Sequence, residues 1–392
     1  MNTEFENIEA YSPGQFREAL LRIIHNSEFR HIVEGICHYQ MKDSCTADEI
    51  ILPLNEVHDL NEFDDVLIIR GLKNLAAKAC NGLQLRGAEN LALPALLLSN
   101  HRDIILDAAF LSVLIKDLTG KRIYFGAGTN LYVQSWVEDM LRINHGFSVI
   151  RGGTVHEMMR NSLQLSSYIR HLITNERAGV WLAQREGRAK NSDDRTQPAL
   201  LKMLAMSGGK NFIESLKELN ITPVAICYEY DPCDYLKAQE MQLRRDNAEW
   251  KKTPQDDFVN MRTGLLGWKG QTVFTIAQPI NQFLDGIEAQ TTNRNEQVTL
   301  VAELIDRLIH TNYCIYNVNR IAYDLYLNTD KFSEDYSDEE KAAFENYIDS
   351  RIALVDIADK DTVFLREKLL EMYSFPLVNQ LEAHKSSRKN AR

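Results

Sequence analysis

Apolar and polar positions alternate in two different ways along the chain. In residues 1–85, apolar side chains such as Phe16, Leu20 and Ile23 recur every three or four positions, as one face of a helix requires. The same spacing returns after about residue 290. We therefore predict a helical N-terminal segment over residues 1–85 and a helical C-terminal segment over residues 290–392.

The region between these segments, residues 86–289, has a different pattern of apolar and polar residues. Short apolar runs bounded by polar residues or glycine alternate with longer amphipathic stretches. Runs of this kind are typical of buried strands, and their alternation with helical stretches indicates an α/β domain. We predict a central mixed or mostly parallel sheet with flanking helices, its strands formed by ALPALLLSN, IYFGAG, FSVI, GVWLAQ, ITPVAICYEY and TVFTIAQPI.

The charge and cysteine content narrow the classes of function. The chain has 44 basic and 55 acidic residues and a formal net charge of −11, so broad nucleic-acid binding is not expected. Any anionic substrate must then be held by a local basic patch. The six cysteines include no CxxC pair, which favours neither a zinc site nor a disulfide framework and fits a reducing cytoplasm.

No apolar run reaches the roughly 18 residues that a membrane-spanning helix needs. The N-terminal stretch MNTEFENIEAYSPGQF is polar and acidic, unlike a secretory signal. We therefore predict a cytoplasmic protein that does not cross a membrane, and we expect its basic tail, HKSSRKNAR, to be disordered.

The stretch LLLSNHRDIILDAAFL, residues 96–111, is where we look for chemistry, and it has three interpretations. In the first it is only a helix start, with Asn100 as N-cap and Asp103 near the positive end of the dipole. That explains Asp103 but leaves His101 and Asp107 without a role. In the second, HRD is a kinase catalytic loop, which would need asparagine at the position that Ala108 occupies, and no DFG follows.

The third interpretation is a histidine–carboxylate pair that activates a hydroxyl group. Other histidines in the chain also have acids at similar spacing, so spacing alone is weak. His101 differs from them because it follows an apolar strand at the start of a helix, where α/β sheets place their ligand sites.

Four ordered blocks then resemble the glycerol-phosphate acyltransferase superfamily, which includes the glycerol-3-phosphate and 1-acylglycerol-3-phosphate acyltransferases. They are SNHRD with Asp107, GFSVIR at residues 146–151, REGR at residues 185–188, and ITPVAICY at residues 221–228, with GAGTNL between the first two. The resemblance covers about residues 90–230, and the order of the blocks is more specific than any one motif.

Two departures from the family pattern affect the predicted site. Five residues, not four, separate His101 from Asp107, and Leu106 stands where the family has its acid. On an ideal helix, residues six apart do not adjoin, so Asp107 reaches His101 only if the helix begins after His101 or bulges. Asp103 is the alternative partner; we favour Asp107 because capping already accounts for Asp103. The third block lacks the family's threonine.

The resemblance implies transfer of a fatty acyl group to a hydroxyl, which suits these residue types. Neutral imidazole is a good general base near neutral pH, and a carboxylate on its other nitrogen holds the required tautomer. An anionic acceptor substrate needs arginines to bind it, because a guanidinium can donate two hydrogen bonds to one phosphate. The candidate substrate-binding residues lie at or just beyond strand ends: Arg102, Arg151, Arg185, Glu186, Gly187 and Arg188.

Two of these residues have roles other than phosphate binding. Glu186 has two interpretations, because it either orders the arginines or contacts an acceptor hydroxyl. Gly187 would let the backbone approach the substrate closely.

The predicted function is therefore acyl transfer from acyl carrier protein or coenzyme A to glycerol 3-phosphate or its 1-acyl derivative, in phospholipid biosynthesis. His101 is the predicted base, with no metal and no bound cofactor. A lipid product implies peripheral association with the inner face of the membrane. The alternatives are acylation of another hydroxylated lipid, such as an acylated amino acid or a lysolipid, and a non-catalytic lipid-binding relative.

Overall fold

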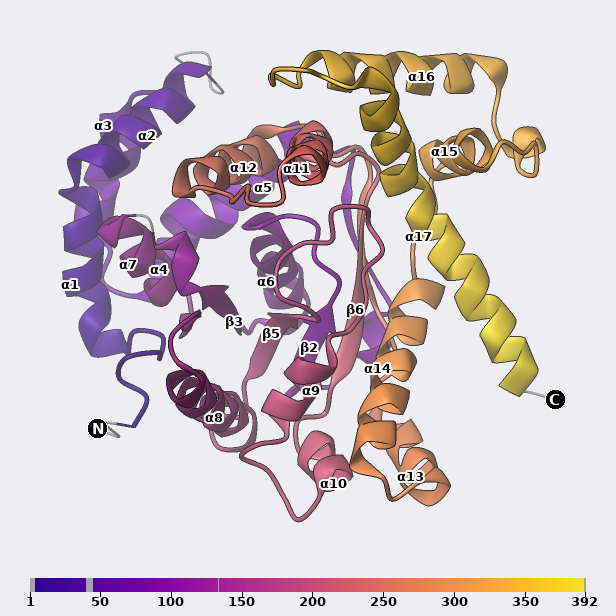
Figure 1. The fold of residues 1–392 in the computed structure, drawn as a ribbon. Helices are drawn as coiled ribbons and strands as arrows, with labels where there is room; N and C mark the ends of the chain where they lie inside the picture. The colour runs from indigo at the N-terminus through magenta and orange to yellow at the C-terminus, as the bar shows by residue number, and fades with distance from the viewer. Residues whose placement is uncertain (1–3, 40–44, 133, 391–392) are drawn as a thin grey trace.

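The computed structural model describes residues 4–39, 45–132 and 134–390. In these residues, seven strands form a single sheet in the spatial order β1-β7-β6-β2-β5-β3-β4. The strands are β1 (Leu83–Arg86), β2 (Leu96–Ser99), β3 (Ile123–Gly128), β4 (Gly146–Val149), β5 (Gly179–Ala183), β6 (Thr222–Tyr228) and β7 (Thr272–Ile276). Figure 1 shows the sheet at the centre of the molecule with helices around it.

The sheet is mixed but mostly parallel, as the sequence predicts. Strands β6, β2, β5, β3 and β4 run in the same direction. Strand β7 is antiparallel to β6, and β1 is parallel to β7. The carboxyl ends of five neighbouring strands therefore meet at one edge, with β2 in the middle of the sheet, which is where an α/β fold places a ligand.

Helices precede, separate and follow the strands. The N-terminal helices are α1 (Pro13–Ile24), α2 (Ser27–Tyr39), α3 (Ala47–Ile51), α4 (Leu60–Phe63) and α5 (Ile69–Ala79). The helices among the strands are α6 (Leu106–Thr119), α7 (Ser135–Ile143), α8 (Val155–Thr174), α9 (Pro198–Leu204), α10 (Phe212–Lys217), α11 (Asp234–Asp246) and α12 (Pro254–Leu266). The C-terminal helices are α13 (Asn281–Gln290), α14 (Arg294–Thr311), α15 (Asn317–Leu327), α16 (Asp338–Ala353) and α17 (Thr362–Asn390). Short 3₁₀ or π segments are η1 (Leu52–Glu56), η2 (Asp64–Ile68), η3 (Ala88–Asn90), η4 (Thr129–Leu131) and η5 (Ser333–Asp335).

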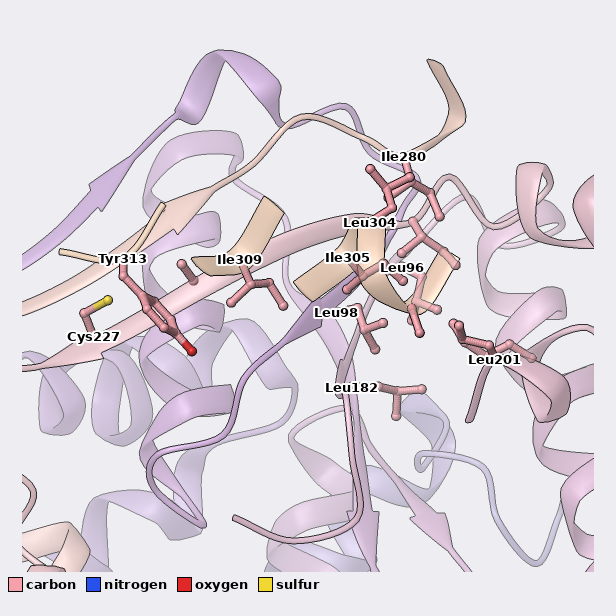
Figure 2. Close-up of a cluster of buried hydrophobic side chains, with 14 of the residues drawn as sticks. Leu96, Leu98, Leu182, Leu201, Cys227, Ile280, Leu304, Ile305, Ile309 and Tyr313 are labelled. Carbon is pink, nitrogen blue, oxygen red and sulfur yellow. The ribbon is translucent and has the colours of Figure 1, made fainter. Parts of the chain in front are cut away.

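Strand β2 is buried on both faces, which explains its unbroken run of leucines. Because side chains alternate along a strand, Leu96 and Leu98 point to one face and Leu97 to the other. Leu96 and Leu98 join a cluster with residues of α9 and α14, which Figure 2 shows around Leu201, Leu304 and Ile305. Leu97 packs with residues of α5 and α6 on the opposite face. The sheet is thus covered by helices on both sides.

The N-terminal helices form a third apolar cluster with α7, and an ion-pair group links them to the sheet region. The carboxylate of Asp64 is fully buried and accepts a hydrogen bond from Arg122 Nε at 2.7 Å. Lys116 Nζ binds the same carboxylate. Two cations on α6 and before β3 thereby compensate one buried charge contributed by the N-terminal segment.

Two predictions about the ends of the chain are wrong. The predicted boundary at residue 85 falls inside β1, a four-residue strand too short to produce a readable alternation. The basic tail was expected to be disordered, but α17 continues to Asn390, beyond which residues 391 and 392 lie outside the described part. After Pro376 the helix meets no further proline or glycine that would end it. In the described residues, no helix is both long and apolar enough to span a membrane.

Asn100 extends the contact between β2 and β6 beyond their last backbone pair. Its side chain is fully buried. Asn100 Nδ2 donates to the carbonyl oxygen of Ile226, and the Ile226 amide donates to Asn100 Oδ1, both at 2.8 Å. The prediction that Asn100 is a helix N-cap is therefore wrong, because the side chain bridges two strands instead.

Replacing Asn100 by alanine should destabilise the fold, because it leaves a buried donor and a buried acceptor of β6 unsatisfied. We expect the free energy of unfolding to fall by about 2–4 kcal/mol, at about 1–3 kcal/mol for each unsatisfied group. Denaturant titration of Asn100→Ala measures this loss. Asn295→Ala, at an exposed helical position, is the control and should change stability little.

Candidate active site

The loop between β2 and α6 carries His101 to the ligand-binding edge of the sheet. Strand β2 ends at Ser99, and α6 begins only at Leu106. Asp103 closes the loop, because its Oδ1 accepts from the amides of Ile105 at 2.9 Å and Leu106 at 2.8 Å. Asp103 therefore does what an N-cap does for α6, the role that the sequence had divided between Asn100 and Asp103.

His101 and Asp107 form a hydrogen-bonded pair, with 2.7 Å between His101 Nδ1 and Asp107 Oδ2. The extra residue between them is accommodated because residues 101–105 are not helical, so the six-residue separation is not measured along a helix. His101 is nearly buried, and its Nε2 forms no hydrogen bond with any described residue. The geometry is that of an imidazole held by a carboxylate on one nitrogen and free to act on the other.

The carboxylate of Asp107 is fully buried and accepts three further hydrogen bonds. Its Oδ2 also accepts from the amides of Arg102 at 2.6 Å and Asp103 at 3.1 Å, and its Oδ1 accepts from the hydroxyl of Tyr228 at 2.9 Å. Asp107 is thus held in one orientation by four donors.

Asp103 accepts its side-chain hydrogen bonds from Ile105 and Leu106, not from His101, and its carboxylate lies against α12. A Cβ at Gly264 of α12 would be 2.0 Å from Asp103 Oδ2, so only glycine lets the helix lie this close to the carboxylate. Burial and the negative charge of Asp107 raise the pKa of Asp103. Of the two acids that the sequence offered as partners, the structure brings Asp107 to the imidazole and uses Asp103 for the loop.

Tyr228 and Trp181 contact this group, and the sequence analysis gave neither of them a role. Burial and the charge of Asp107 raise the pKa of Tyr228 well above 10, so the phenol stays protonated and donates. Trp181 lies with its ring edge-on to His101 at 5.8 Å and donates from Nε1 to Ser99 Oγ at 2.9 Å. Tyr228 is the last residue of the fourth sequence block. Its place at the end of a predicted strand was the signal from which a position near His101 could have been predicted.

A cavity of about 1970 Å³ lies beside His101, and its lining is apolar in one part and basic in another. Toward α5, α6 and α7 the lining is largely apolar, with Ile69, Leu72, Ala109, Val113, Val137 and Met140. Toward β4, β5, α11 and α12 it is largely basic. Among the described residues, eight arginine and lysine side chains line the cavity against four carboxylates. The chain as a whole has a net charge of −11, so this positive excess is local.

Three of the four predicted arginines line the basic part of the cavity: Arg151, Arg185 and Arg188. Arg188 is buried and donates from Nη2 to Asn260 Oδ1 at 2.8 Å, while its Nη1 has no hydrogen-bond partner among the described residues. Although burial opposes its charge, Cys233, Asp231 and Asp103 raise the pKa of Arg188 above its usual value. Arg188 therefore stays charged, with donors available to a ligand.

Arg151 depends on a neighbouring glycine and on Glu186. A Cβ at Gly128, the last residue of β3, would lie 2.8 Å from Arg151 Nε, so the glycine leaves room for the guanidinium. Arg151 Nη1 lies 3.2 Å from Glu186 Oε1, which matches the interpretation of Glu186 as a residue that orders the arginines. Gly187 follows with a φ of 68°, a left-handed conformation that favours glycine, and its backbone lines the cavity.

Arg102 does not line this cavity, and its prediction as a substrate-binding residue needs correction. Its guanidinium is buried on the other side of the loop, where Nη2 lies 3.0 Å from Asp194 Oδ2. Burial opposes its charge, but Asp194 raises its pKa above the usual value. Consecutive residues of an extended loop point in opposite directions, so Arg102 points away when His101 points inward.

The sequence analysis missed five further cations of the cavity because they lie outside the four blocks. They are Arg122, Lys190, Arg244, Lys252 and Arg262. Burial lowers the pKa of Lys190 to about 8, and Glu240 holds the ammonium at 2.6 Å. Arg122 directly precedes β3, whereas the folding of α11 and α12 over the sheet edge brings the other four to the site. Spacing along the chain carried no signal for these positions.

Comparison with known families identifies this region. Residues 82–228 match the family model described as Acyltransferase. The match begins at β1 and ends at Tyr228, so it includes the loop of His101, the partner Asp107 and the three cavity-lining arginines. A comparison with curated proteins finds no match. The resemblance predicted from the four blocks is thereby confirmed: residues 82–228 of this chain are similar to the Acyltransferase family.

Proposed function

We propose that the protein transfers a fatty acyl group from a thioester to a hydroxyl of glycerol 3-phosphate or of its 1-acyl derivative. The observation that carries this proposal is the His101–Asp107 pair, which lies in a cavity that is apolar on one side and cationic on the other. The similarity to the Acyltransferase family supports acyl transfer, and the cationic lining favours a phosphorylated acceptor.

In the proposed mechanism, His101 is the general base. With its proton on Nδ1, the ring donates to Asp107 Oδ2 and keeps a lone pair on Nε2. Nε2 takes the proton of the acceptor hydroxyl as the oxygen attacks the thioester carbonyl carbon. The tetrahedral intermediate collapses with cleavage of the C–S bond, and the imidazolium returns the proton to the thiolate. The products are an ester and a free thiol, with no acyl-enzyme.

Asp107 contributes in two ways that follow from its contacts. It holds the tautomer that leaves Nε2 unprotonated, and its negative charge stabilises the imidazolium that forms during attack. Because four donors fix the carboxylate, little reorganisation is needed as the charge develops on the ring.

The two sides of the cavity suit the two parts of the substrates. Its volume of about 1970 Å³ exceeds that of a typical small-molecule pocket, about 300–1,000 Å³. We assign the apolar side to acyl chains and the side of Arg151, Arg185 and Arg188 to the acceptor phosphate. Acyl carrier protein and coenzyme A remain the two candidate donors, and the lipid product makes the membrane surface the proposed place of reaction.

An acyl-transfer assay with the purified protein tests the proposal. Acyl-coenzyme A and acyl-acyl-carrier-protein are each offered with glycerol 3-phosphate, 1-acylglycerol 3-phosphate, and uncharged hydroxylated lipids. We expect ester formation with a phosphorylated acceptor. Transfer to an uncharged acceptor alone would favour another hydroxylated lipid, and absence of transfer from either donor would favour a non-catalytic relative.

His101→Ala should lower kcat by about 10²–10⁴-fold, because it removes the general base.

Asp107→Asn should lower kcat by about 10³–10⁴-fold, because asparagine does not hold the required tautomer. The matched control is Asp103→Asn, which keeps an acceptor for the loop amides and should cost less than about 10-fold. Steady-state kinetics with circular dichroism to check folding separate these variants. The assignment fails if Asp103→Asn is the inactive variant.

Arg151→Ala should raise the KM of the acceptor about 10-fold or more while leaving the KM of the donor nearly unchanged. The removed contact is a charged hydrogen bond to phosphate, worth about 1.5–3 kcal/mol. Arg294→Ala, an exposed arginine that does not line the cavity, serves as the control. Equal effects on both KM values would mean that Arg151 does not bind the acceptor phosphate.

Tyr228→Phe should lower kcat about 10-fold without raising either KM, because it removes one of the four donors to Asp107 and nothing from the cavity lining. Tyr336→Phe is a matched control, since it removes a tyrosine–aspartate hydrogen bond of 3.0 Å to Asp324, outside the site. A wild-type kcat for Tyr228→Phe would show that three donors suffice to position Asp107.

A further inference from the structure

The first turns of α8 expose apolar side chains that no described residue covers. Val155 is 79% exposed and Met159 is 65% exposed, and Met158 and Leu163 are also exposed. Positions 155, 159 and 163 are four residues apart and Met158 is three residues from Val155, so the four side chains gather on one side of the helix. We refer to these four residues as the α8 apolar face. Further along α8 the same stripe holds the buried Ser166, Ile169 and Ile173, so the helix begins before the structure that covers this stripe. An exposed apolar group of this kind indicates a contact with something outside the chain.

The rest of α8 is covered, which shows how local the exposure is. Gln164 Nε2 donates to the carbonyl oxygen of Glu4 at 2.6 Å, and the Ala10 amide donates to the hydroxyl of Tyr168 at 3.2 Å. Phe5 packs against the ring of Tyr168. The N-terminal segment thus lies along α8 from Gln164 onward and leaves the preceding turns open.

The α8 apolar face continues into the cavity of the active site. Met158 belongs to the face and also lines the cavity. Ile150 on the same side and Phe258 of α12 on the other are likewise both exposed and cavity-lining. An apolar surface therefore leads from the outside of α8 to the space beside His101.

Exposed positive charge lies beside this surface. Arg160 follows Met159 on α8, and Arg262 of α12 lines the cavity; both are exposed, and neither forms an ion pair with a described residue. The nearest acid on α8, Glu157, accepts from the amide and hydroxyl of Thr154 at 2.8 Å in a capping box, and the charge of Arg160 also acts on it. Apolar side chains flanked by exposed arginines are the combination that binds a bilayer surface, with the arginines at the headgroups.

We propose that the α8 apolar face docks on the surface of a lipid bilayer and turns the mouth of the cavity toward the membrane. This inference rests on the proposed function, since it explains how a lipid acceptor or product passes between the bilayer and His101. Four apolar side chains on two turns make a shallow contact, so the binding should be reversible.

Vesicle flotation of the full chain tests the docking. The vesicles are phosphatidylcholine alone or phosphatidylcholine with 30 mol% phosphatidylglycerol, and the variant is Val155→Asp/Met159→Asp, which changes two exposed residues that do not line the cavity. We expect wild type to float with the mixed vesicles and the variant to bind at least about 10-fold more weakly. Val363→Asp is the matched control, because Val363 of α17 is 78% exposed and should not affect binding.

Three results would overturn the docking: wild type that floats with neither vesicle, a variant that floats like wild type, or equal losses in Val155→Asp/Met159→Asp and Val363→Asp. A wild-type dimer that this variant dissociates, without vesicle binding, would assign the face to a second copy of the chain and also overturn it.

The test is separate from the one for acyl transfer because flotation needs no turnover. Should the transfer assay find no activity while the variant still loses vesicle binding, the proposed function fails and the docking stands. With soluble glycerol 3-phosphate as acceptor and no vesicles, the variant should keep wild-type turnover. A loss of turnover there would mean that the substitutions disturb the site itself, and it would overturn the assignment of α8 as a docking surface.

Discussion

The buried carboxylate of Asp107 is the constraint on which the rest of the site depends. An ionised carboxylate is costly to bury unless it is hydrogen-bonded, and Asp107 is fully buried. Its four donors come from His101, from two amides of the β2–α6 loop and from Tyr228 at the end of β6. The loop must therefore fold back over the first turn of α6, and β6 must lie directly beside β2. The hydrogen bonds of Asn100 to Ile226 keep β6 beside β2.

Much of the fold could be predicted because the strands of this sheet have a strong signal. Six of the seven are short apolar runs bounded by polar residues or glycine, and β2 has three consecutive leucines before Ser99 because both of its faces are buried. Strand β1 was not predicted. Its four residues alternate between partly buried and exposed, and so short a stretch cannot be told from the end of the preceding helix. The start of α6 was also misplaced, since a polar sequence after a strand does not reveal whether Asn100 caps a helix or crosses to a neighbouring strand.

The candidate site was predictable where it lies in the sequence blocks and not where it depends on tertiary contacts. His101, Asp107 and three arginines follow strand ends, and parallel strands bring their carboxyl ends together. Arg102 failed because adjacent residues in a loop face opposite ways, which spacing along the chain does not show. The closeness of Gly264 to Asp103, and the arrival of Lys190, Arg244 and Lys252, depend on how α11 and α12 lie over the sheet. Such positions become visible only once the helices are packed.

The division of the cavity follows from the same packing. The apolar side lies where side chains of α5, α6 and α7 line the cavity, and an apolar lining of this kind is the least costly place to hold a long alkyl chain. The cationic side lies where strand ends and α11–α12 meet, at the edge to which loops deliver their polar residues. His101 lies where these sides join, between the proposed places for the acyl chain and for the phosphate. A protein of net charge −11 thus concentrates arginine and lysine side chains at one edge without becoming basic overall. The exposed apolar side chains of α8 lie beside exposed arginines, so apolar and cationic groups also meet at the surface next to the cavity.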